Sequence, residues 1–110
     1  KNPTMSNTPI LPPMDSFTSK TIIRVREPYL IVHEKISSLL SFNDVNLLFS
    51  LSNFSISCLT IKNHESLKFM VRFLSSDDDD DIILEFQKRN GSFSTFFGIF
   101  CNVKKTFEDS

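Results

Sequence analysis

The chain has 110 residues, 40% hydrophobic and 23% charged, with a formal net charge of -1. This length fits one domain with one modest core, and the composition excludes collagen-like, coiled-coil, disulfide-scaffold and wholly disordered proteins. A net charge near zero alone argues against a membrane or nucleic-acid partner. However, five of the 13 acidic residues stand in one run, Asp77–Asp81, which leaves 8 acids against 12 basic residues elsewhere.

Residues 1–19 predict a flexible linker, because four prolines occur there among Ser, Thr and Asn. We expect the folded domain to occupy residues 20–110. The start of the chain does not resemble a signal peptide, and no apolar run approaches the roughly 18 residues that a membrane-spanning helix needs. Because the chain begins with Lys1, we expect it to be part of a longer protein.

The first half of the domain predicts a strand followed by a helix. Residues Thr21–Arg26 alternate between apolar and basic side chains, as a half-buried strand does. Pro28 suits the first turn of a helix, where its missing N–H costs nothing. The apolar residues of Pro28–Leu40 then recur at helical spacing, and Phe42-Asn43-Asp44 ends this helix.

Three antiparallel strands are predicted next. Residues 54–59 alternate, Leu67–Phe73 alternate most clearly, and Ile82–Phe86 form the last strand. Leu47–Leu51 is left open as either an earlier strand or a lead-in. We expect Asp77–Asp81 to be a hairpin loop that stays in water, because five like charges repel one another.

A second helix is predicted after Asn90-Gly91, with Ser92 or Ser94 as its N-cap. Most of its apolar stripe is aromatic, with Phe93, Phe96, Phe97, Phe100, Val103 and Phe107 at helical spacing. The predicted fold is therefore α+β: a four-stranded antiparallel sheet with two helices packed on one face, in the order β-α-β-β-β-α. The other face is left for solvent or a partner.

Few residues point to catalysis. We interpret His33 as a partly buried packing residue and His64 as a surface residue in a turn. Cys58 and Cys101 have no second Cys or His at metal-ligand spacing, so we expect buried, reduced thiols in a cytosolic protein. No nucleophile motif, phosphate-binding glycine loop or calcium-loop spacing occurs. The sequence thus predicts a non-catalytic domain with no metal and no cofactor.

The basic residues are more informative. Seven lie on or beside the predicted strands: Lys20, Arg24, Arg26, Lys68, Arg72, Lys88 and Arg89. If the strands are neighbours, these side chains form a patch away from the helices. Each Lys or Arg near an anionic membrane contributes about 1 kcal/mol, so the patch predicts peripheral binding to acidic phospholipids. The alternative is scattered solubilising charge. We do not expect a nucleic-acid partner, because the aromatic residues are committed to the core.

The C-terminal third resembles the kinase-associated-1 domain. In Phe86-Gln87-Lys88-Arg89-Asn90-Gly91-Ser92-Phe93-Ser94-Thr95-Phe96, a basic pair follows an aromatic residue, a turn glycine stands five residues after that aromatic, and another aromatic stands five further on. Thr21–Arg26, Pro28–Leu40 and Leu67–Phe73 are similar to the family's first strand, first helix and penultimate strand. The resemblance covers about residues 20–108.

This resemblance implies a regulatory C-terminal domain of a Ser/Thr protein kinase, of the microtubule-affinity-regulating, checkpoint or fungal septin-associated bud-neck type. It implies binding of phosphatidylserine and phosphoinositides, with Lys88 and Arg89 as the basic pair and Arg24 and Arg26 on the basic first strand. The kinase would be cytoplasmic and peripheral at the plasma membrane, at the bud neck in fungi. The alternative is an autoinhibitory or scaffold-binding module that contacts its own kinase domain or a septin scaffold. Lipid binding requires that Asp77–Asp81 project away from the patch.

Overall fold

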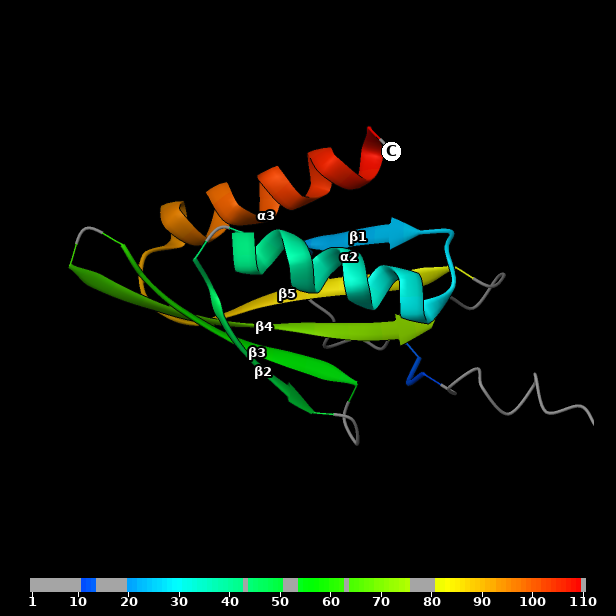
Figure 1. The fold of residues 1–110 in the computed structure, drawn as a ribbon. Helices are drawn as coiled ribbons and strands as arrows, with labels where there is room; N and C mark the ends of the chain where they lie inside the picture. Colours follow the sequence, from blue (N-terminus) through cyan, green and yellow to red (C-terminus); the bar gives the residue numbers. More distant parts are fainter. Residues whose placement is uncertain are drawn as a thin grey trace, which may run out of the picture.

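The computed structural model describes residues 11–13, 20–42, 44–50, 54–62, 64–75 and 81–109. Its elements are β1 (Ile22–Val25), α2 (Tyr29–Phe42), β2 (Asn46–Ser50), β3 (Ser55–Lys62), β4 (Glu65–Ser75), β5 (Ile82–Asn90) and α3 (Phe93–Glu108). All strand pairs are antiparallel, and the sheet order is β1-β5-β4-β3-β2 (Figure 1). The first strand of the domain therefore lies beside the last one.

The predicted α+β class is confirmed, but the prediction of four strands is wrong because the sheet has five. The additional strand is β2, which pairs with β3 at one edge, Leu48 opposite Ser57. Its sequence does not alternate, and Leu48 exposes 72% of its surface. The other strands are predicted by a period-two alternation of apolar and polar side chains. An edge strand that exposes an apolar side chain to water, as β2 does, lacks this alternation. The order of elements is thus β-α-β-β-β-β-α.

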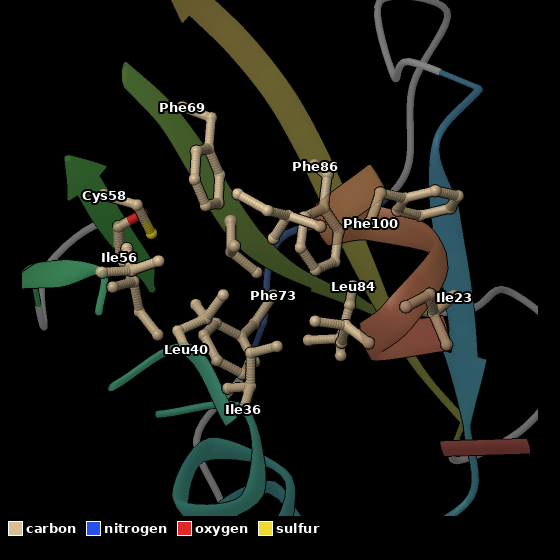
Figure 2. Packing of buried hydrophobic residues seen from close by; sticks show 14 of the residues in the cluster. Ile23, Ile36, Leu40, Ile56, Cys58, Phe69, Phe73, Leu84, Phe86 and Phe100 are labelled. Carbon is tan, nitrogen blue, oxygen red and sulfur yellow. The ribbon is translucent and has the colours of Figure 1, made fainter. Parts of the chain in front are cut away.

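Both helices cover the same face of the sheet (Figure 1). Val32, Ile36 and Leu40 of α2 are buried at helical spacing, and the buried residues of α3 join the same apolar cluster. Aromatic rings join α3 to the sheet, because Phe86 meets Phe100 edge-on at 5.2 Å between centroids (Figure 2). Phe69 likewise meets Phe96 at 5.8 Å. Each fully buried side chain of this size contributes about 1.5–3 kcal/mol, so this cluster dominates stability.

The turn before α3 depends on a glycine and a serine. Gly91 has a φ of 117°, and a Cβ atom there would lie 2.7 Å from the Ser66 carbonyl oxygen. Ser92, one of the two predicted candidates, is the N-cap, and its Oγ accepts a hydrogen bond from the Thr95 N–H at 3.4 Å. This turn fixes where α3 begins, close against β4.

Part of the predicted linker contacts the domain. The Ser75 N–H donates to the Pro12 carbonyl oxygen at 2.8 Å, and Pro13 bridges to the same residue in parallel orientation. Leu11 packs against the apolar cluster. Residues 1–10 and 14–19 lie outside the described residues. The three described residues of this segment therefore extend the sheet contacts at the end of β4.

Candidate functional site

The sheet face away from the helices, here called the outer face, carries several of the predicted basic residues. Alternate residues of a strand point to opposite faces, so the neighbours of the core residues point outward. This places Arg24 of β1, Lys68 and Arg72 of β4, and Glu85 of β5 on the outer face. The structure distributes the seven predicted cations over this face and its two ends, and it does not gather them into one patch.

In the middle of the outer face, Glu85 is fully buried and paired. Arg72 Nε donates to Glu85 Oε1 at 2.5 Å, and Gln87 Nε2 donates to Oε2 at 3.0 Å. Arg72 and Glu85 are direct cross-strand partners in β4 and β5. A buried carboxylate loses its hydration, and these hydrogen bonds and the opposite charge of Arg72 compensate that loss. Sequence reasoning missed this pair, although opposite charges at facing positions of two alternating strands are a usable signal once their register is known.

At one end of β1, Asp81 neutralises two further cations. It is only 4% exposed, and its Oδ2 lies 3.3 Å from Arg24 Nη1 while its Oδ1 lies 3.2 Å from Arg26 Nε. The prediction that the acidic run stays in water is therefore wrong for its last member. Residues 77–80 lie outside the described part of the chain. Repulsion within the run favours exposure, but two arginines that meet the last aspartate only after folding stabilise it in a buried position.

The remaining four predicted residues lie together at the opposite end of the sheet. Lys68 faces Asn90 across the β4–β5 pair, and Phe69 faces Lys88. The Phe86 N–H donates to the Thr21 carbonyl oxygen at 2.9 Å, which puts the preceding residue, Lys20, at this end as well. We call Lys20, Lys68, Lys88 and Arg89 the basic end.

The basic end is exposed, and no described carboxylate compensates its charge. Its four side chains are all solvent-exposed, and within the described parts of the chain none of them forms an ion pair with a carboxylate. The register shifts beside Lys68, so Arg89 is an extra residue of β5, and its Nη2 lies 3.6 Å from Met70 Sδ on the outer face. Lys88 points to the helix-covered side. Lys88 and Arg89 therefore point to opposite faces of the sheet.

The basic end lies far from the acidic segment's attachment points. Ser75 pairs with Ile82 at the other end of the β4–β5 pair, and residues 76–80 join the strands there. Seven residues along β4 separate this end from Lys68, which is about 23 Å at the rise of an antiparallel strand. The sheet thus separates an end where a carboxylate meets arginines from an end whose cations pair with no described carboxylate.

A groove of about 560 Å³ lies between α2 and the last turns of α3. Its lining is mainly apolar, including Ile31, Leu39, Phe42 and Phe107, and Phe42 is 89% exposed. Lys35 forms one wall, with its Nζ 2.9 Å from Glu27 Oε1 and 5.7 Å from the centre of the Phe107 ring. Sequence reasoning missed the groove because two helices far apart in the chain build it.

The remaining titratable candidates have structural roles. His33 stacks on Phe73 at 5.5 Å between ring centroids, and partial burial lowers its pKa, which confirms the predicted packing role. His64 is exposed in a turn, also as predicted. Burial raises the pKa of the Cys58 thiol to about 12. The prediction of a second buried thiol is wrong, because Cys101 lies on the exposed side of α3. Among the described residues, no three His, Cys, Asp or Glu side chains are grouped to hold a metal ion.

Comparisons with known proteins add no family assignment. No protein-family model matches the chain, and no curated protein matches it significantly. None of the helices in the described ranges is long and apolar enough to cross a membrane.

Proposed function

We propose that this chain is a non-catalytic regulatory domain that binds anionic phospholipids through its basic end. The observation that carries the proposal is the gathering of four exposed cations, none paired with a described carboxylate, at one end of the sheet. At about 1 kcal/mol for each cation near an anionic surface, four give about 4 kcal/mol, a dissociation constant near the millimolar range. Binding of this strength is peripheral and reversible.

Asp81, the described member of the acidic run, does not oppose this mode of binding. Asp81 is already compensated by Arg24 and Arg26. Its end of the sheet is about 23 Å from the basic end by strand rise, more than twice the Debye length of about 8 Å at physiological ionic strength. A bilayer that meets the basic end is therefore screened from the negative charge at the other end.

The resemblance to kinase-associated-1 domains extends the proposal to a parent protein. Lys88 and Arg89, which match the family's basic pair, belong to the basic end. The parent would be a cytoplasmic Ser/Thr protein kinase that this domain brings to the plasma membrane, at the bud neck if the protein is fungal. Phosphatidylserine and phosphoinositides would be the lipids bound.

Vesicle sedimentation tests the proposal. The chain should sediment with vesicles of phosphatidylcholine and phosphatidylserine, but not with vesicles of phosphatidylcholine alone. Binding should weaken as salt is raised, because exposed charges are screened. Equal sedimentation with neutral vesicles, or binding insensitive to salt, contradicts the proposal.

A second candidate function is favoured by the groove between α2 and α3. We propose it as a contact site for the parent's own kinase domain, in an autoinhibitory arrangement. Ile31→Ser with Phe42→Ser should then raise the activity of the full-length kinase, because exposed apolar lining residues are lost. Leu30→Ser is the matched control, since Leu30 is exposed on the same helix but does not line the groove. Unchanged activity, or an equal rise in the control, contradicts this function.

A further inference from the structure

Two phenylalanines at the start of α3 are exposed. Phe93 is 59% exposed and Phe97 is 43% exposed. Their rings stack at 5.6 Å between centroids with 18° between the planes. Phe93 also contacts buried Phe96, and Phe97 contacts buried Phe100. The two rings thus form an exposed aromatic surface that packs on buried residues of the core.

This aromatic pair lies at the basic end. Phe93 follows Asn90, the cross-strand partner of Lys68, by three residues. Phe96, which touches Phe93, packs on Phe69, whose cross-strand partner is Lys88. The start of α3 accordingly lies beside the end of β5 (Figure 1). Lys88 therefore lies on the same side of the sheet as the exposed rings, and Lys68 and Arg89 lie at the same end on the outer face.

We infer that Phe93 and Phe97 insert into the interfacial region of an anionic bilayer while the basic end holds the lipid headgroups. This inference rests on the proposed function. Aromatic rings bordered by Lys and Arg are the pattern of surfaces that lie in the headgroup region, with the rings below the charges. The two contributions reinforce each other, because both act on one rigid surface.

The charges favour a bilayer over a second copy of this chain as the partner. A symmetric dimer through Phe93 and Phe97 would bring two basic ends together, since each copy presents the same patch. Like charges facing each other oppose association. An anionic bilayer offers negative charge to the cations and an apolar layer to the rings, so it satisfies both parts of the surface.

A tryptophan reporter tests the insertion directly, because the chain contains no Trp. In Phe93→Trp, the indole emission should shift to the blue on binding to phosphatidylserine-containing vesicles and be quenched by brominated acyl chains. The matched control is Phe42→Trp, which places the reporter at an exposed phenylalanine of α2. Its emission should not change when the same vesicles are bound.

Sedimentation of the same samples separates the two proposals. If Phe93→Trp sediments with the anionic vesicles and its emission neither shifts nor is quenched, insertion is wrong and lipid binding by the basic end stands. If neither reporter protein sediments, the proposed function and the insertion both fail. As a second variant, Phe93→Ser with Phe97→Ser should weaken binding by about tenfold or more, because the apolar contribution is lost. This loss should persist at high salt, and an unchanged affinity at every salt concentration contradicts the insertion.

Discussion

At the turn before α3, Gly91 occupies a conformation that other residues rarely adopt. With its φ of 117°, an added Cβ would also lie 2.9 Å from Leu67 Cα, in the backbone of β4. Gly91→Ala should therefore lower the free energy of unfolding by about 1–3 kcal/mol, through backbone strain and a clash that backbone atoms cannot avoid. Urea denaturation followed by circular dichroism measures this change.

Gly98 provides the matched control for Gly91. It lies inside α3, and a Cβ there meets no atom within 4 Å. Gly98→Ala should raise the free energy of unfolding by about 0.5–1 kcal/mol, because Ala is the better helix former. Equal changes in the free energy of unfolding for the two substitutions would mean that the close backbone contact at Gly91 does not affect stability.

His33 gives the domain a pH dependence of known sign. Partial burial lowers the pKa of this imidazole from its ordinary value of 6.5. The unfolded chain then binds the proton more readily than the folded chain, so stability is fully present above about pH 6.5 and declines as the pH falls below it. His33→Gln should reduce the loss of unfolding free energy between about pH 7 and pH 5. An identical pH dependence in the variant would contradict this role.

At the scale of elements, the predictable parts are those whose pattern is set by one buried face. The helices α2 and α3 and the strands β1, β3 and β4 show their period because the core lies mainly on one side of each. Strand β5 differs, because residues 82–86 are all buried. The edge strand β2 lacks that period and is held by its pairing with β3. The buried carboxylates could not be predicted, because their arginine partners are neighbours only in the folded sheet.

The ion pairs of Asp81 tie β1 to the beginning of β5. Replacing Arg24 and Arg26 together with Gln removes two guanidinium groups that pair with this nearly buried carboxylate. We expect the free energy of unfolding to fall by about 1–3 kcal/mol, because a buried charge loses compensation. Thermal and urea denaturation measure it.

The control for this pair is Lys68→Gln with Arg89→Gln. Both residues are exposed, and neither pairs with a described carboxylate, so stability should change by no more than about 0.5 kcal/mol. A loss of stability equal to that of the Arg24 and Arg26 variant would mean that the basic end has structural partners. The two variants together separate structural arginines from cations available to a ligand.

For the whole molecule, the net charge of -1 conceals a separation of charge. The sequence supplied all seven candidate cations, but the strand register decides which of them meet a carboxylate. Arg24, Arg26 and Arg72 do, whereas the basic end remains uncompensated by described carboxylates. The location of the proposed lipid-binding surface therefore follows from the pairing of charges across strands, which composition and alternation alone do not reveal.

We propose that the position of the cations, and not their number, determines lipid binding. Two adjacent exposed pairs allow a matched comparison: Lys88 and Arg89 at the basic end, and Lys104 and Lys105 near the far end of α3. Each double substitution to Gln removes the same charge. Lys104 is 11 residues from Phe93, about 16 Å along the helix by its rise per residue.

The decisive measurement is the affinity of both variants for phosphatidylserine-containing vesicles by sedimentation at physiological salt. Lys88→Gln with Arg89→Gln should bind about 30-fold more weakly than the unaltered chain, at about 1 kcal/mol for each lost cation. Lys104→Gln with Lys105→Gln should bind nearly as well as the unaltered chain. Equal losses in the two variants, or no loss in the first, would contradict binding through the basic end.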